Sequence, residues 1–196
     1  WFGEAPGRTF ELSDEVSNLR EQLDERLEDP AAAESWLMTE TRSGPTAAHQ
    51  VVEYARAQKA AIGFLPSKHR VVFERFFDES GGMQLVIHAP FGARINKAWG
   101  LSLRKRFCRT FNFELQAAAT DNGLNIALAE QHSFPLADVF QFLNVETVQS
   151  ILEQAALPSP IFGTRWRWDA NRALALLRFQ GGKKVPPQIQ RMRSDD

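Results

Sequence analysis

Two segments of this sequence are rich in basic residues and nearly free of acidic ones. Residues 91–113 contain six lysines and arginines and no acid, and residues 163–193 contain eight bases against Asp169 alone. Clustered basic residues indicate binding to a polyanion, because each base that contacts a phosphate releases a counterion that was bound to the nucleic acid. We therefore predict that these residues bind nucleic acid: Arg94, Lys97, Arg104, Lys105, Arg106, Arg109, Arg165, Arg167, Arg172, Lys183 and Lys184.

The basic segments also have an ordinary explanation, because a charge-rich helix is usually just a solvated face. The bases could instead neutralise acidic neighbours, since residues 1–45 carry eleven acids and four bases, although the net charge of the whole chain is only −1. Solvated faces normally mix the two signs, however, and residues 91–113 do not. For the bases of residues 91–113 we therefore favour contact with phosphates.

The second basic segment opens with the sequence RWRW at residues 165–168. Residues two apart lie about 200° apart around a helix, so the two tryptophans cannot share one helical face. In a strand they would share a face, but the Asp-Ala-Asn that follows disfavours an extended strand. We predict a helix with at least one tryptophan in the core, its buried side continued by Ala173, Leu174 and Leu177.

The chain carries no motif for catalysis or nucleotide binding. A GxxxxGK[ST] loop is absent, and the glycine pairs at residues 81–82 and 181–182 lack its context. The four histidines never fall at metal-ligand spacing, and the lone Cys108 excludes an internal disulfide and a cysteine-based zinc site. We expect no catalytic residue, metal or cofactor in this chain and no ATP hydrolysis by it alone.

Four polar residues of the middle segment have two interpretations each. His88, at the end of a predicted strand, could contact a phosphate or could simply be a hydrogen-bonded residue. Glu74, Asp78 and Glu79 resemble charges at the end of a hairpin, and a role as catalytic carboxylates is the minority interpretation.

The composition is that of an ordinary soluble globular protein. Hydrophobic residues make up 43% and charged residues 24% of the 196 positions. No apolar run approaches the roughly 20 residues that cross a bilayer, no signal peptide is recognisable, and a single cysteine fits a reducing cytosol. Because the sequence starts with Trp-Phe-Gly and stops after Ser-Asp-Asp, which normally begins a helix, we expect a piece of a longer protein.

Helical patterns dominate the beginning of the chain. Residues 13–28 predict a helix capped by Ser13, with an apolar stripe of Val16, Leu19, Leu23 and Leu27. A second helix is predicted from about Thr46 to the stop at Gly63, with one face made of Val51, Tyr54, Ala55, Gln58 and Ile62. Pro30 and the RSGPT stretch bracket a less defined segment between them.

The pattern then changes to strands around one helix. HRVVFERFF and MQLVIHA are strand-like and are joined by DESGG, whereas FELQAAA and LNIALA flank an Asn-Gly hairpin signal. Between these pairs, residues 92–111 have helical spacing, with an apolar stripe of Ile95, Trp99, Leu103 and Phe107. We expect this stripe to pack on the sheet and to leave the bases of the same helix facing outward.

The rest of the chain predicts helices at residues 136–144 and 145–157 and a further one entering at Ile161. The fold class is therefore α+β, with antiparallel strand pairs packed with a basic helix and followed by an all-helical C-terminal part.

Several stretches together resemble one family. They are WFGEAPGRTFELSDEVSNLREQL, ERFFDESGGMQLVIHAPFGARINKAWGLSLRKRFCRTFNFELQAAATDNGLNIAL, FGTRWRWDANRALALLRF and GGKKVPPQIQRMRSDD. They are similar to the DEAD/H-associated domain that follows the motor and winged-helix domains of large-helicase-related (Lhr-type) superfamily 2 DNA helicases. The resemblance runs in the family's order over nearly the whole chain.

The resemblance implies a part of a bacterial ATP-dependent helicase that moves 3′ to 5′ on single-stranded DNA and unwinds DNA and RNA:DNA duplexes in repair or nucleic-acid processing. ATP and Mg would belong to motor domains outside this chain. The expected parts are the end of a barrel portion plus a helical segment (1–63), a ββαββ module (64–130) and a helical module (131–196). Expected partners are DNA and the motor and winged-helix domains of the same polypeptide, in the cytoplasm with the nucleoid and without a membrane.

The resemblance also implies that a tryptophan of the barrel portion stacks on a base of the tracking strand, and Trp1 matches that position. Two other functions remain open. One is an architectural domain that docks a partner through the acidic first segment. The other is a base-excision enzyme, because the domain is similar to winged-helix DNA glycosylases, although no glycosylase site is recognisable here.

Overall fold

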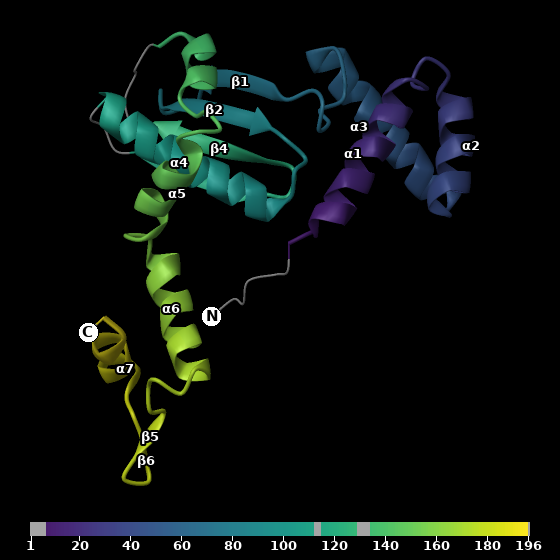
Figure 1. Cartoon of the computed structure of the whole chain (residues 1–196). Helices are drawn as coiled ribbons and strands as arrows, with labels where there is room; N and C mark the ends of the chain where they lie inside the picture. The colour runs from purple at the N-terminus through teal and green to yellow at the C-terminus, as the bar shows by residue number, and fades with distance from the viewer. Residues whose placement is uncertain (1–6, 112–114, 129–133, 196) are drawn as a thin grey trace.

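A computed structural model describes residues 7–111, 115–128 and 134–195. Three helices, α1 (Phe10–Asp24), α2 (Pro30–Thr41) and α3 (Pro45–Ile62), lie beside a sheet, and the C-terminal elements extend away from it (Figure 1). The hydroxyl of Thr9 accepts the Leu12 N–H and starts α1 earlier than predicted. Ser13 is therefore not the cap and lies buried inside the helix. Gly63, with φ of 89°, ends α3 as predicted.

The three helices enclose a small core of their own, made of Leu23, Leu27, Ala33, Leu37, Ala48, Val52, Ala55 and Leu65. The predicted stripe of the first helix is confirmed at Leu23 and Leu27. The predicted face of α3 is confirmed at Ala55, which is buried, and is wrong at Val51 and Tyr54, which are 43% and 66% exposed. Small residues occupy the contact face of α3 instead, since close packing of α2 against α3 leaves little room there.

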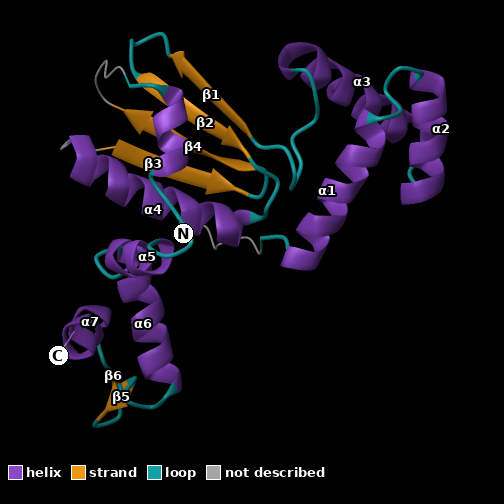
Figure 2. Ribbon diagram, turned by 45° about the horizontal axis from the view of Figure 1, so that its top comes forward, coloured by secondary structure: helices purple, strands orange, loops and turns teal. Residues whose placement is uncertain are grey.

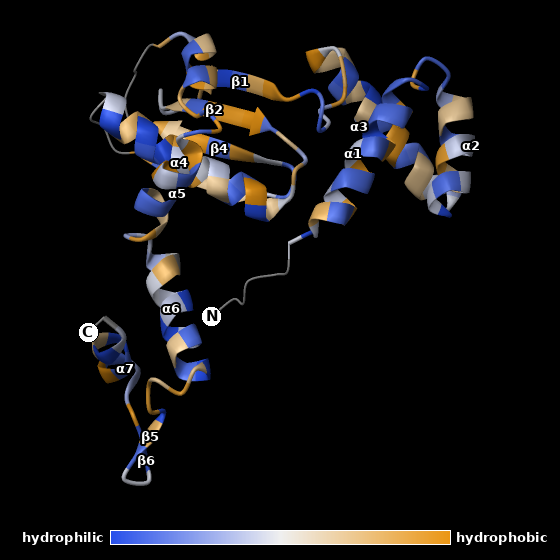
Figure 3. Cartoon of the chain, in the orientation of Figure 1, coloured by the Kyte–Doolittle hydropathy of each residue, from blue (hydrophilic) through white to orange (hydrophobic). Residues whose placement is uncertain are grey.

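The sheet has four strands, β1 (Val72–Phe77), β2 (Met83–His88), β3 (Leu115–Thr120) and β4 (Gly123–Leu128). They are antiparallel in the order β1-β2-β4-β3, which confirms both predicted hairpins. In the first hairpin the Asp78 carboxylate accepts the backbone N–H groups of Ser80 and Gly82. Figure 3 shows hydrophobic residues along these strands.

Helix α4 (Ala93–Phe111) lies across one face of the sheet (Figure 2). Leu103 and Phe107 are buried there against the strands, as predicted. Ile95 was expected in the same stripe, but its side chain is 42% exposed. Asn96 takes the buried position in the first turn, since its amide donates to the carbonyl oxygens of Ala89 and Thr120.

The C-terminal part consists of the 3₁₀ helix η1 (Leu136–Gln141), the helices α5 (Val148–Ala156), α6 (Pro160–Arg172) and α7 (Pro187–Asp195), and a short hairpin of β5 (Phe179–Gln180) and β6 (Lys183–Lys184). This part is helical as predicted except for the hairpin. Two glycines with positive φ, Gly181 and Gly182, allow that tight reversal. The α+β class is confirmed. None of the described helices is both long and apolar enough to cross a membrane.

Candidate nucleic-acid interface

Five bases of α4 lie on the side of the helix opposite its buried row. At 100° per residue, the directions of Arg94, Lys97, Arg104, Lys105 and Arg109 fall within about 140°, facing away from Asn96, Leu103 and Phe107. All five side chains are exposed or half-buried, and they make no hydrogen bond or ion pair within the described part of the chain. The predicted outward-facing basic surface is therefore present.

Arg106 differs from these five bases. Its side chain is half-buried, and its Nε–H donates to the backbone carbonyl oxygen of Phe142 at 2.6 Å. Phe142 in turn packs edge-on against Phe107, with ring centroids 4.9 Å apart. Arg106 therefore ties α4 to the segment after η1, and this bond competes with the predicted phosphate contact.

Helix α5 packs against α4, and the basic residues of α4 form two groups along the helix. Arg94 and Lys97 lie in the first turns of α4, and Arg104, Lys105 and Arg109 lie about 15 Å further along its axis, at 1.5 Å per residue. A pocket of about 300 Å³ opens between the second group and α5, lined by Arg104, Lys105, Cys108, Gln154 and Ser159 among others. Among the described residues, no acidic side chain lines this pocket.

The predicted bases of the C-terminal segment are also exposed or half-buried, but some of them are already engaged. The guanidinium of Arg165 lies over the Trp168 ring, 5.4 Å from its centroid. Arg172 pairs with Asp169 at 3.7 Å. Lys183 and Lys184 form strand β6 and are exposed. Arg165 and Arg172 are therefore less available than the five outward-facing bases of α4.

The prediction of a buried tryptophan in the RWRW motif is wrong. Trp166 and Trp168 are 50% and 41% exposed. The indole N–H of Trp166 donates to the Ser194 carbonyl oxygen at 2.7 Å, and its ring is nearly parallel to Phe162. Leu174 is 83% exposed, because α6 ends at Arg172 and Leu174 has a φ of 59°, which interrupts the helical period.

Leu177 and Ala173, which were expected on the same buried side, are exposed as well. Leu176 is the residue that is buried instead.

The polar residues of the first hairpin have structural partners. The Nε2 atom of His88 lies 2.9 Å from a carboxylate oxygen of Glu74. His88 follows the buried Ile87 in β2 and so faces away from α4. Hydrogen bonds from Ser80, Gln84 and Gly82 lower the pKa of Asp78, which fits a carboxylate that shapes the turn. Among the described residues, no group of three or more His, Cys, Asp or Glu is placed to hold a metal ion.

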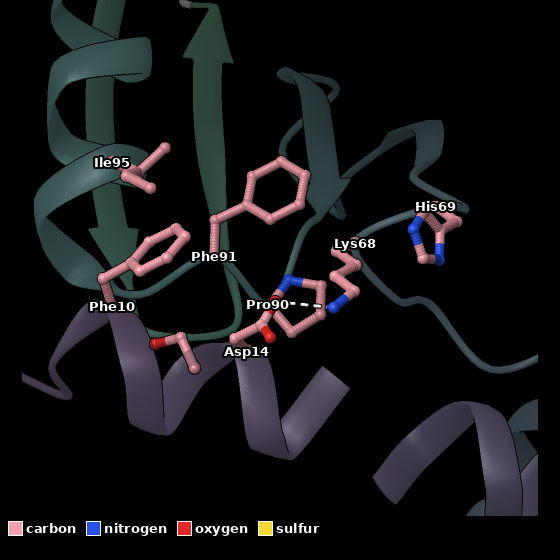
Figure 4. A pocket seen from close by; sticks show the side chains of 8 residues that line it. Phe10, Asp14, Lys68, His69, Pro90, Phe91 and Ile95 are labelled. Atoms are coloured by element: carbon pink, nitrogen blue, oxygen red, sulfur yellow. Dashed lines mark hydrogen bonds and ion pairs between the residues drawn. The ribbon is translucent and has the colours of Figure 1, made fainter. Parts of the chain in front are cut away.

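The sequence analysis missed a pocket of about 420 Å³ between α1, the loop before β1 and the start of α4 (Figure 4). Phe10, Pro90, Phe91 and Ile95 form its apolar walls. The only signal in the sequence was a Pro-Phe-Gly turn after a strand, and nothing there indicated that α1 would lie beside it. Trp1, the predicted stacking residue, lies outside the described residues.

Comparison with known proteins connects this surface to a family. The family model for DEAD/H-associated domains matches residues 65–196. This chain belongs to the DEAD/H-associated family. The resemblance that the sequence motifs indicated is thereby confirmed.

Relatives of this DEAD/H-associated domain are Lhr-type helicases. It is 32% identical to the Lhr helicase/probable uracil glycosylase of Mycolicibacterium smegmatis over 147 residues, which are 74% of this chain and 10% of that protein. It is 27% identical to the Lhr helicase/uracil glycosylase of Escherichia coli over 99% of this chain and 12% of that protein. An ATP-dependent helicase Lhr-Core from Methanothermobacter thermautotrophicus is 24% identical over 98% of this chain and 22% of its own length.

A solved structure matches the whole fold. It is the Mycobacterium smegmatis helicase Lhr bound to single-stranded DNA and AMP-PNP, with a TM-score of 0.78 and 27% identity over 100% of this chain and 24% of that one. The chain thus spans between a tenth and a quarter of the relatives it matches, as an accessory part of Lhr-type helicases.

Proposed function

We propose that this domain binds single-stranded DNA in an Lhr-type ATP-dependent helicase and helps to form the channel for the tracking strand. The observation that carries the proposal is the row of five bases on α4 that have no protein partner among the described residues. A folded domain gains nothing from five like charges on one face, because they repel one another. Phosphates on that face remove the repulsion and release counterions.

The neighbouring structure supports this proposal, because the helicase that shares this fold was solved bound to single-stranded DNA. In the whole protein, motor domains outside this chain would supply ATP and Mg, and this domain would couple ATP hydrolysis to 3′-to-5′ unwinding of DNA or RNA:DNA duplexes. The motor and winged-helix domains of the same polypeptide would be its protein partners. We place the helicase in the bacterial cytoplasm with the nucleoid, acting in DNA repair or nucleic-acid processing.

Trp1 belongs to this proposal through the family resemblance alone. We propose that it stacks on a base of the tracking strand, an interaction worth about 1–3 kcal/mol. In the full-length helicase, Trp1→Ala should then uncouple ATP hydrolysis from unwinding and leave the ATPase rate nearly unchanged. A variant with normal melting temperature and normal unwinding would contradict the stacking role, whereas a lowered melting temperature would identify Trp1 as a core residue.

The test of DNA contact uses the salt dependence of binding by the full-length helicase. Each phosphate neutralised on a single strand contributes about 0.7 to the slope of log affinity against log salt. Replacing two contacting bases among Arg104, Lys105 and Arg109 with Gln should flatten the slope by about 1.4, with a similar loss for every DNA sequence. An unchanged slope in folded variants would leave the domain an architectural brace.

A further inference from the structure

The pocket beside α1 has the walls of a site for a flat apolar group. Figure 4 shows Phe10 of α1 pointing toward Pro90 and Phe91 of the loop after β2, with Ile95 of α4 beside them. Phe10 is 67% exposed and Ile95 is 42% exposed. Large apolar side chains gathered around a cavity of about 420 Å³ are typical of a ligand site.

The same pocket has polar groups that suit a neutral ligand. Lys68 Nζ and a carboxylate oxygen of Asp14 are 2.7 Å apart, so the two charges compensate each other. Ser13, which also lines the pocket, is 2% exposed, and its hydroxyl has no hydrogen-bond partner in the described part of the chain. A bare phosphate would find no free positive charge on the described residues of these walls. A neutral ring with hydrogen-bonding edges fits them better.

A free cation lies next to the pocket wall. Arg94 directly precedes Ile95, which lines the pocket, and has no protein partner among the described residues. Lys97 is two residues beyond Ile95 and therefore faces away from the pocket. An apolar slot for a ring next to one cation for a phosphate matches the chemistry of one nucleotide within a single strand.

We propose that this pocket holds one unpaired base of a single strand, stacked on Phe10 and Phe91, with an adjacent phosphate on Arg94. The proposal rests on the proposed function and adds a base-binding position to the phosphate contacts of α4. A buried apolar side chain from another part of the polypeptide is the competing occupant.

The experiment measures the affinity of the full-length helicase for oligonucleotides in which one abasic site is moved along the strand. Wild type should lose affinity when the abasic site occupies the pocket position. Phe10→Ala should weaken binding of the intact strand by about 5- to 150-fold and should no longer respond to the abasic site at that position. Phe10→Leu keeps the apolar wall but not the aromatic ring, so its affinity for the intact strand should lie between those of wild type and Phe10→Ala.

Tyr54→Ala is the matched control, because Tyr54 is an aromatic residue of similar exposure, 66%, on α3 outside the pocket. Tyr54→Ala should give the same affinity as wild type at every position of the abasic site along the strand. If no position of the abasic scan depends on Phe10, the base site is wrong. If Phe10→Ala instead lowers the melting temperature of the helicase with an unchanged abasic profile, a protein side chain occupies the pocket.

The salt slope separates this result from the proposed function. Phe10→Ala should keep the wild-type slope, because it removes no charge, whereas the Gln variants of Arg104, Lys105 and Arg109 should flatten it. If the Gln variants flatten the salt slope but Phe10→Ala responds to the abasic site as wild type does, the base-binding pocket is wrong and DNA contact by α4 stands. An unchanged slope in the Gln variants would overturn DNA contact by α4.

Discussion

The guanidinium Nε–H of Arg106 donates to the carbonyl oxygen of Phe142 at 2.6 Å, and this bond distinguishes Arg106 from every other base of α4. Arg106→Gln should therefore lower the free energy of unfolding by about 1.5–3 kcal/mol, the usual contribution of a hydrogen bond to a charged group. The same substitution should leave the salt slope of DNA binding unchanged. Arg109→Gln is the matched variant, since it should flatten the slope by about 0.7 with little effect on stability.

Chemical denaturation and binding titrations of the two variants check this pair of outcomes. A flattened slope for Arg106→Gln at unchanged stability would show that the hydrogen bond to Phe142 gives way to a phosphate in the complex.

The C-terminal bases should contribute less to DNA binding than those of α4. Arg165 lies over Trp168 and Arg172 pairs with Asp169, so a phosphate must compete with these partners. We expect Arg165→Gln combined with Arg172→Gln to flatten the slope by less than the 1.4 that two free contacts would give. The salt slopes of the C-terminal and α4 variants, measured in the same salt series, show which set of bases contributes more to DNA binding. A larger change of slope in the C-terminal double variant would contradict the prediction.

Glu21 should stabilise the contact between α1 and the loop before β1 in a pH-dependent way. A hydrogen bond from the Ser67 hydroxyl, assisted by His69, lowers the pKa of Glu21. A carboxylate whose pKa is lower in the folded state adds stability above its unfolded pKa, and this stability is lost as the pH falls through the folded pKa. Glu21→Gln should therefore lower the melting temperature at pH 7.

The difference in melting temperature between wild type and Glu21→Gln should shrink as the buffer is acidified. Glu28→Gln serves as the control, because Glu28 is exposed and makes no hydrogen bond or ion pair among the described residues. A difference for Glu21→Gln that stays constant from neutral to acidic pH would mean that the carboxylate charge is not what stabilises the contact.

Gly123 should not tolerate a side chain. A β-carbon at this position would meet the carbonyl oxygen of Ile87 closer than real β-carbons approach any atom. Gly123→Ala should then cost about 1–3 kcal/mol of unfolding free energy by overpacking. Gly163→Ala is the counterpart, because it lies within α6 with open space around it and should stabilise by up to about 1 kcal/mol. Equal changes of the unfolding free energy for Gly123→Ala and Gly163→Ala would contradict the close approach of residue 123 to the carbonyl oxygen of Ile87.

The Asn-Gly signal predicted the second hairpin correctly, but for a different physical reason. Such a signal usually reports glycine at positive φ, whereas Gly123 has no positive φ and begins β4 beside Ile87. The hairpins and α4 could be predicted because each depends on short-range periodicity. The position of Ile95 could not, because Asn96 displaces it through hydrogen bonds to two distant backbone segments.

The candidate site was predictable in composition but not in arrangement. Counting charges found all the bases of α4, since like charges without acids are visible in the sequence. Nothing local revealed that Phe142 engages Arg106 or that Phe10 approaches Phe91, because these contacts join segments far apart in the chain. The buried side expected after the RWRW motif failed for a local reason, since Leu174 at positive φ interrupts the helical period beyond Arg172.

The spacing of the α4 bases in two groups has a consequence for the shortest DNA that the domain can hold fully. The two groups lie about 15 Å apart, a distance that roughly four or five stacked nucleotides span at about 3.4 Å each. The nearest members of the two groups, Lys97 and Arg104, are about 10 Å apart along the axis, so an oligonucleotide shorter than about three nucleotides can engage only one group at a time. A longer one engages the second group intramolecularly, at a high effective concentration. The affinity for single-stranded DNA should therefore rise in a step as the oligonucleotide becomes long enough to reach both groups. The domain would then bind more tightly once a helicase has exposed a single strand of that length.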